Sequence, residues 1–287
     1  RRVTADIINT HAAAKSTSAI QVVYEVTLGG GAPAPARFDG QLNFYDDLLI
    51  EGSVNINNGS GTASNSADLG AQTISVQGNI TVSNIFLENV RVLNSTGDVF
   101  VDSGIMLDQV YANGNVTLDR SAEVTRVYSL GTVDIAGGGA EADFIYAHGD
   151  ISINSSGSGS FVVEEASTLS NVFVRKIGGS TIGKILAGKN VVVGEGRDFS
   201  KRINSIHTKG DITFVNARRF GSVGEIKGEG NIQCDALSAS DLNGPGTYSI
   251  NGTTDKNSCN SLINTGANNA VPLMAQLQPF ELNTFII

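Results

Sequence analysis

A short motif recurs along the chain and limits what the chain can fold into. It is a glycine, a short polar residue, and two branched apolar residues separated by one position, as in Gly52-Ser-Val-Asn-Ile56. We call the first residue of each copy the anchor. Further anchors are Gly78, Gly97, Gly114, Gly131, Gly149, Lys189, Gly210 and Gly230. Apolar alternation over such short stretches predicts strands of about three residues rather than helices.

The residues upstream of each anchor repeat as well. Small or apolar residues stand seven, four and two places before it; before Gly114 they are Leu107, Val110 and Ala112. A degenerate copy predicts one more anchor near Lys176, and its apolar residues are Leu169, Val172 and Val174. Each repeat therefore offers two or three very short strands.

Strands this short cannot form a sheet within one repeat. Stacking the repeats solves the problem, because each strand pairs with its copy in the next coil and the inward residues merge into one core. We therefore predict an all-β, single-stranded parallel β-helix (β-solenoid) of about ten coils over residues 41–235. The expected inward residues include Val99, Val101, Val116, Leu118, Val133 and Ile135.

The two ends of the chain lack the repeat. Apolar residues over 3–26 fall near a helical stripe, which predicts an N-terminal helix within residues 1–30, followed by a Gly/Pro linker over 31–40. Residues 236–287 contain several turn signals, such as Gly244-Pro-Gly246, and are expected to form an irregular capping segment.

Extra residues between repeats fall mostly after the second strand, at 57–70, 136–141, 154–168 and 194–202. If the positions within each repeat are assigned correctly, these loops leave from one corner of the solenoid. Such insertions often mark a binding face, although exposed corners also tolerate insertions without any function. The candidate binding residues taken from the loops are Asn57, Ser60, Asn154, Ser158, Arg197, Lys201 and Arg202.

The net charge of −9 argues against general nucleic-acid binding by the whole surface. A local basic patch is the exception that the sequence leaves open. Its candidate members are Lys184, Lys189, Arg197, Lys201 and Arg202.

One carboxylate pair stands out, because Asp102 and Asp119 lie five places after the anchors of adjacent coils, with Arg120 nearby. Their expected separation of about 5 Å resembles a retaining glycosidase pair, and they could also hold calcium. Asp is equally a common turn residue, and the next coil has no Asp at the equivalent position. We therefore expect no catalytic residue, metal or cofactor. Phe100 and Tyr111 are isolated, weak candidates for carbohydrate contacts.

Residues 177–182 and 187–194 resemble the hexapeptide repeats of left-handed helix acyltransferases. Those enzymes use a catalytic histidine, whereas His148 and His207 lie several coils apart here and His11 lies in the predicted helix. The resemblance therefore implies shared corner geometry rather than acyl transfer.

The Gly-Asn/Asp-Ile/Val-x-Val repeat resembles two groups of bacterial β-solenoids. One is the polymer-forming bactofilin type, and the other is found in type IV pilus minor pilins and pilus-assembly proteins. Such pilins carry an N-terminal helix, a globular part and often a C-terminal disulfide loop, a plan that residues 3–26, the linker and Cys234 with Cys259 match. No prepilin cleavage motif is present. The repeat indicates fold rather than role.

The sequence thus favours a non-enzymatic, pilus-associated or cell-surface structural and adhesion protein outside the bacterial cell. The implied partners are other pilus or surface subunits and host or surface glycans. The chain starts at Arg1 without Met and has no long apolar run, so membrane contact is expected only through a segment upstream. A bactofilin-like self-polymerising scaffold and a surface polysaccharide-active β-helix enzyme remain the alternatives.

We predict that Cys234 and Cys259 form a disulfide in an oxidising compartment, with two separate buried thiols as the alternative. The bond would close a loop of about 25 residues and stabilise the fold by roughly 3 kcal/mol. Mass spectrometry of unreduced protein should find one Cys234–Cys259 cross-linked peptide. Two freely alkylated thiols in native protein would refute the pairing.

Overall fold

The structure is a computed structural model of the chain. It describes residues 21–23, 26–28, 48–51, 54–57, 66–68, 72–83, 86–102, 104–155, 162–177, 181–194, 202–215, 222–235 and 247–250. These residues form parallel strands of a β-solenoid of about seven turns, and none of them is helical. The chain divides into two compact units, residues 1–130 with 278–287 and residues 131–277.

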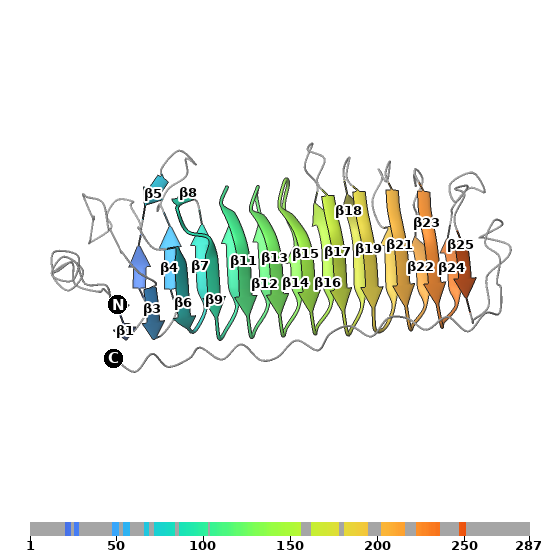
Figure 1. Cartoon of the computed structure of the whole chain (residues 1–287), viewed down its shortest axis with the longest axis horizontal. Coiled ribbons are helices and arrows are strands. Elements are labelled where there is room, and N and C mark those ends of the chain that lie inside the picture. Colours follow the sequence, from blue (N-terminus) through green and yellow to red (C-terminus); the bar gives the residue numbers. More distant parts are fainter. Residues whose placement is uncertain are drawn as a thin grey trace. The chain divides into compact units, whose positions relative to one another are not determined.

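Unit 1 contains two long parallel sheets and one short one (Figure 1). Sheet A of this unit consists of β1 (Gln21–Val23), β3 (Leu48–Glu51), β6 (Thr73–Gln77), β9 (Val92–Ser95), β11 (Met106–Ala112) and β13 (Glu123–Ser129). Sheet B consists of β2 (Val26–Leu28), β4 (Val54–Asn57), β7 (Ile80–Ser83), β10 (Val99–Asp102) and β12 (Val116–Asp119). The short sheet pairs β5 (Ser66–Asp68) with β8 (Phe86–Glu88).

Unit 2 repeats the arrangement, with one strand from each sheet in every coil. Its sheet A consists of β15 (Glu141–Ala147), β17 (Val162–Thr168), β19 (Thr181–Ala187), β21 (Arg202–Thr208), β23 (Ser222–Gly228) and β25 (Thr247–Ile250). Its sheet B consists of β14 (Val133–Ile135), β16 (Ile151–Ser155), β18 (Val172–Ile177), β20 (Val191–Gly194), β22 (Ile212–Val215) and β24 (Ile232–Asp235).

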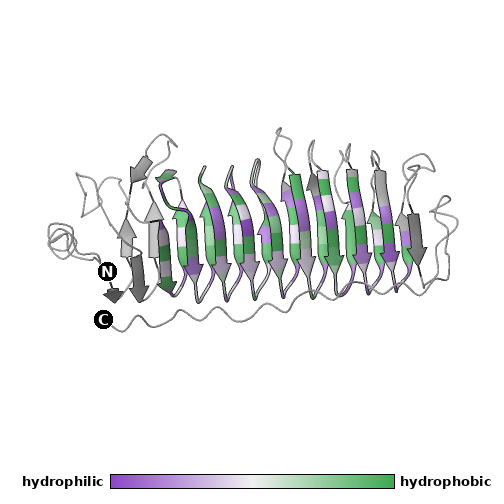
Figure 2. Cartoon of the chain, in the orientation of Figure 1, coloured by the Kyte–Doolittle hydropathy of each residue, from purple (hydrophilic) through white to green (hydrophobic). Residues whose placement is uncertain are grey.

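The predicted inward residues are confirmed. Val99, Val101, Val116, Leu118, Val133 and Ile135 are each at most 1% exposed. In unit 1, Val99 pairs with Val116 and Val101 with Leu118, so the same frame position repeats from coil to coil. Hydrophobic and hydrophilic residues alternate along the described strands (Figure 2), as expected for strands with one face in the core.

A backbone irregularity that recurs in the strands of sheet A explains the spacing of three and then two between apolar residues upstream of each anchor. In unit 1, the N–H groups of Asp108 and Gln109 both donate to the carbonyl oxygen of Arg91, at 2.8 and 3.1 Å. In unit 2, the pairing skips Gly183 between Ile182 and Lys184. One residue is skipped on both paired strands, so the register is kept while the alternation shifts by one position, and residues three apart both face inward.

Asparagine and aspartate side chains link neighbouring coils at the short corner between sheets A and B. In unit 2, Asp150 Oδ1 accepts the backbone N–H of Asn171 at 3.0 Å, and Asn171 Oδ1 accepts that of Asn190 at 3.1 Å. The series continues from Asn190 to Asp211 at 2.9 Å and from Asp211 to Asn231 at 2.7 Å. This ladder accounts for the short polar residue after each anchor, because its side chain supplies an acceptor to the next coil.

The ladder also explains the pKa of Asp150. Burial of the carboxylate acts to raise its pKa, but hydrogen bonds from Ser170 and Asn171 stabilise the charged form more strongly, with help from the nearby Lys189 charge. The net result is a pKa below the ordinary value for aspartate. The carboxylate therefore keeps its charge while it accepts from the next coil.

Close coil approach accounts for the preference for glycine at the anchor. A Cβ atom added to Gly210 would lie 2.6 Å from the backbone of Lys189, and one added to Gly230 would lie 2.4 Å from the backbone of Gly210. Both distances are far below van der Waals contact, so a larger residue requires the coils to move apart locally.

The anchor predicted near Lys176 is wrong; the anchor of that coil is Ser170. The strand residues Val172 and Val174 follow it, and Val172 pairs with Val191 of the next coil. The three upstream inward residues are Val163, Ala166 and Thr168, all buried, whereas Leu169 is 40% exposed. Thr168 Oγ1 accepts the N–H of Ser170 at 2.9 Å and donates to the carbonyl of Gly149. This repeat was assigned wrongly from the sequence because its anchor is serine rather than glycine.

Differences in coil length are confined to one corner. Within each unit, three residues separate a sheet A strand from the following sheet B strand in every coil from β9 onward. The return connection to sheet A, here called the variable corner, ranges from three residues at 120–122 to eleven at 236–246. Two predicted loops are shorter than expected, because residues 66–68 form β5 and residues 162–168 form β17. Both stretches gain backbone partners by pairing with neighbouring strands.

The ends of the chain also differ from expectation. Residues 21–23 and 26–28, placed at the end of the predicted helix, are strands that pair with β3 and β4. Valine is β-branched, and the parallel pairing satisfies backbone groups that a helix would otherwise satisfy internally. Residues 247–250 of the predicted capping segment form β25.

Several other predictions from the sequence concern residues outside the described part of the chain. They are the helix over 3–20, the linker over 31–40, the remainder of the capping segment, the side chain of Cys234 and the whole of Cys259. The disulfide stays a prediction.

Replacing Val116 by aspartate should unfold unit 1, because the side chain is 0% exposed and an unpaired carboxylate would be buried. The expected loss is about 4 kcal/mol, a large part of a typical domain stability. Thr117→Asp is the matched control, since Thr117 lies in the same strand and is only partly buried. Urea titration followed by circular dichroism measures both. A Val116→Asp protein as stable as Thr117→Asp would contradict the assigned frame.

Candidate functional site

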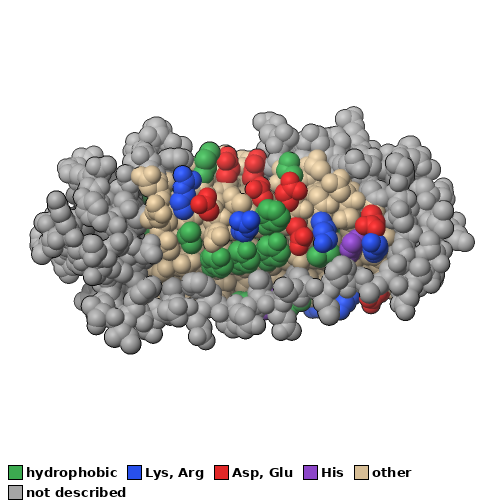
Figure 3. Space-filling view, viewed as in Figure 1, with side chains coloured by type: hydrophobic (Ala, Val, Ile, Leu, Met, Phe, Trp, Pro, Cys, Tyr) green, Lys and Arg blue, Asp and Glu red, His purple; other side chains and the backbone are tan. Residues whose placement is uncertain are grey.

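The outer face of sheet A in unit 2 carries two rows of mainly polar side chains. Parallel, in-register pairing puts equivalent residues of neighbouring coils about 4.8 Å apart. The first row is Glu165, Lys184, Ser205 and Glu225, and the second is Ser167, Leu186, His207 and Lys227. Acidic and basic side chains intermingle on the face seen in Figure 3. Charges of opposite sign are thus within reach of one another along the rows.

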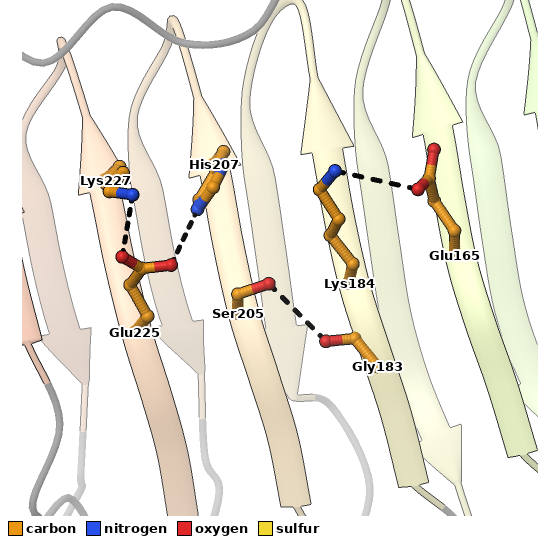
Figure 4. Close-up of polar contacts among 7 residues, drawn as sticks. All are labelled: Glu165, Gly183, Lys184, Ser205, His207, Glu225 and Lys227. Carbon is orange, nitrogen blue, oxygen red and sulfur yellow. Dashed lines mark hydrogen bonds and ion pairs between the residues drawn. The ribbon is translucent and has the colours of Figure 1, made fainter.

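The most connected group is formed by His207, Glu225 and Lys227 (Figure 4). Glu225 Oε2 lies 3.0 Å from His207 Nε2, and Glu225 Oε1 lies 2.7 Å from Lys227 Nζ. One carboxylate therefore joins side chains from two strands, β21 and β23. A second pair, Lys184 Nζ with Glu165 Oε2 at 3.6 Å, joins β19 to β17 in the same way.

These contacts lower the pKa of Glu225. The largest cause is the hydrogen bond from Lys227; burial opposes it, and the hydrogen bond and charge of His207 add to the lowering. His207 is nearly buried, at 7% exposed, and its Nδ1 atom is buried with no hydrogen-bond partner among the described residues. Within the described part of the chain, the ring is therefore held through Nε2.

The arrangement does not assemble a hydrolytic triad from Ser205, His207 and Glu225. The hydroxyl of Ser205 donates to the carbonyl oxygen of Gly183 at 3.4 Å rather than to the imidazole. The His207 nitrogen that Glu225 leaves free is buried, whereas a general base must reach both nucleophile and substrate. These side chains instead form a coil-to-coil network of ion pairs.

Unit 1 carries an aromatic stack on the same outer face. The rings of Tyr111 and Tyr128, paired residues of β11 and β13, have centroids 4.8 Å apart and planes 6° apart. The Tyr111 hydroxyl donates to Gln109 Oε1 at 2.9 Å. Burial first, and then the charge of Tyr128, raise the pKa of the Tyr111 phenol, against a smaller lowering by Arg126.

The expectation that Tyr111 is an isolated aromatic residue is wrong. Its in-register neighbour is Tyr128, whereas Phe100 pairs with Thr81 and Thr117. A sugar platform presents an open ring face to its ligand. In the tyrosine stack, one face of each ring is covered by the other ring, so the pair is poorly suited to that role.

Asp102 and Asp119 are register neighbours, as predicted from the sequence. Arg120 Nε lies 3.1 Å from Asp102 Oδ1, and the Arg120 N–H donates to Asp119 Oδ1 at 2.8 Å. Arg120 and Ser121 have φ values of 39° and 59° and form a left-handed turn after β12. The two carboxylates thus hold this turn, one by an ion pair and one by a backbone hydrogen bond. Nowhere in the described part do three or more His, Cys, Asp or Glu residues form a potential metal site.

The loop residues proposed as binding candidates are only partly described. Asn57 ends β4, Asn154 lies in β16, and Arg202 begins β21. Ser60, Ser158, Arg197 and Lys201 lie outside the described residues, as do the side chains of Asn57 and Arg202.

The proposed basic patch is not assembled by its two described lysine side chains. Lys184 lies on the outer face of sheet A and pairs with Glu165. Lys189 lies at the short corner, next to the ladder residue Asn190. Neither lysine belongs to the variable corner that contains Arg197 and Lys201.

The ion-pair group and the tyrosine stack were not anticipated. Their signal in the sequence is positional, because Tyr111, Tyr128, His207 and Lys227 all stand three places before an anchor. Comparing the outward positions of successive repeats, as was done for the inward ones, would have aligned these residues. Which neighbours pair also depends on side-chain conformation, which the frame does not specify.

Comparison of the chain with family models, with curated proteins and with solved structures finds no match. Among the described residues, no helix has the length and apolar character needed to cross a membrane.

The low pKa of Glu225 means that its ion pairs stabilise the fold at neutral pH and lose that contribution as pH falls through the lowered pKa of the folded state. Glu225→Gln should therefore lower the unfolding free energy at pH 7 by less than about 1 kcal/mol, because the carboxylate is partly exposed. The difference from wild type should shrink at pH 3. Glu229→Gln, which removes an exposed charge at the next corner, is the matched control. Equal effects of both variants at every pH would contradict the ion-pair assignment.

Proposed function

We propose that this chain is a non-enzymatic structural or adhesion protein of a bacterial cell surface or pilus, built as a rigid β-solenoid that presents variable loops. The observation that carries the proposal is the confinement of length variation to one corner. In unit 2 the short corner always has three residues, while the variable corner ranges from three residues at 178–180 to eleven at 236–246.

A solenoid scaffold of this kind favours binding of a partner rather than catalysis. The interior is filled by aliphatic side chains such as Ile151, Val172 and Val191, so a partner would bind at the loops or on the outer walls. The ladder of Asn and Asp side chains and the paired strands hold the loop bases at fixed spacing. Loops on a rigid scaffold are the usual location of binding residues in repeat proteins.

The finer parts of the proposal rest on the sequence repeat. They are a solenoid of about ten coils, a C-terminal segment closed by Cys234 and Cys259, and an attachment to pilus or surface subunits. The resemblance to solenoid segments of pilus proteins supports the location. Host or surface glycans are the expected ligands of the loops.

The test is to shorten the variable corner and measure adhesion. Residues 58–65, 156–161 and 195–201 would each be replaced by the three-residue turn Arg120-Ser-Ala122, which already joins a sheet B strand to a sheet A strand. Cells carrying the shortened proteins should lose binding to glycan-coated or host-cell surfaces, while circular dichroism shows an intact β-fold.

The matched control keeps the loops and changes the outer wall, for example by Thr213→Ser in β22. A hydrolase screen with wild type and Asp102→Asn runs in parallel. Full adhesion after shortening all three segments, or a measurable hydrolysis that Asp102→Asn abolishes, would refute the proposal.

A further inference from the structure

The stacked pair Tyr111 and Tyr128 brings two oxidisable side chains into fixed register on the outer face of unit 1. Their strands pair in parallel and in register, so the two rings occupy equivalent positions in neighbouring coils. The ring centroids are 4.8 Å apart and the ring planes nearly parallel, at 6°. Both side chains are partly exposed, so a small oxidant can reach them without unfolding of the core.

We infer that Tyr111 and Tyr128 form an oxidative cross-linking site, at which a peroxide-dependent one-electron oxidant joins them as dityrosine. This inference goes beyond the proposed function and does not depend on it. The product is a covalent link between β11 and β13, and hence between two successive coils.

The reaction balances with hydrogen peroxide as the terminal oxidant. Each phenol loses one electron and one proton to become a phenoxyl radical, and peroxide takes up two electrons and two protons to become two waters. The ring carbons ortho to each oxygen then form one carbon–carbon bond. The hydrogen on each bonded carbon moves to its phenolic oxygen, which restores both phenols.

The surroundings of Tyr111 fit this chemistry. Its hydroxyl donates to Gln109 Oε1, and its raised pKa keeps the phenol protonated at neutral pH, so the electron and the proton must leave together. The bond requires the two rings to tilt toward each other at one edge. They can do so by side-chain rotation on the outer face, while the adjacent core residues Val110 and Val127 stay buried.

The fixed register favours this pair over tyrosines of other molecules. Two groups held in contact behave as if at very high local concentration, so the coupling is effectively unimolecular. Its yield should therefore be independent of protein concentration, whereas coupling between molecules should fall on dilution.

The experiment treats the full chain with a peroxidase and hydrogen peroxide at several protein concentrations. The expected product is a monomer with dityrosine fluorescence, a mass lower by two hydrogen atoms, and a proteolytic fragment that contains Tyr111 joined to Tyr128. Tyr111→Phe and Tyr128→Phe keep the rings but remove one phenol, so each should abolish the 111–128 fragment and lower the monomer fluorescence. Tyr146→Phe is the matched control and should leave the 111–128 fragment in place.

Urea unfolding of the oxidised monomer provides a second measurement. The cross-linked protein should unfold at a higher urea concentration than untreated protein, and oxidised Tyr111→Phe should not show the shift. Dityrosine found only between molecules, only in other tyrosine pairs, or not at all in a folded monomer would overturn the inference.

Discussion

An inner strand of this solenoid, such as β10, depends on hydrogen bonds to the coil before it and the coil after it. Sheet B strands such as β10 and β12 have four residues, too few to be stable as an isolated hairpin. Their backbone groups are satisfied because Val99 to Asp102 pair in register with Val116 to Asp119. The core columns, the corner ladder, the ion pairs and the tyrosine stack all follow from this one repeat distance.

The repeat in the sequence was sufficient to predict the fold class and the inward face. Val99, Val116 and their equivalents are buried because branched apolar residues alternate after each anchor. Ser170 was missed because the search relied on glycine at the anchor. Residues 21–26 were assigned to a helix because apolar spacings of three and four suit a helix, yet the sheet A strands also have inward apolar residues three apart, and the valines at 22, 23 and 26 favour a strand.

The outer surface was harder to predict, because its residues are not constrained by a core. The frame predicts that Asp102 lies beside Asp119, and it does so correctly. The repeat does not predict that Arg120 contacts both carboxylates, because those contacts depend on a left-handed turn. Likewise, the position of Glu225 follows from the repeat. Its contacts with both His207 and Lys227, however, depend on side-chain geometry.

In the side-chain hydrogen bonds described between coils at the short corner, the later coil supplies the donor and the earlier coil supplies the acceptor. The oxygen of Asp150 accepts from Asn171 of the following coil, and the hydroxyl of Ser129 donates back to Gly114 of the preceding one, at 2.7 Å. A coil that has already formed therefore carries the acceptors that the next coil needs. A polypeptide that emerges N-terminus first can thus add coils one at a time onto a finished template, so synthesis and folding proceed in the same direction.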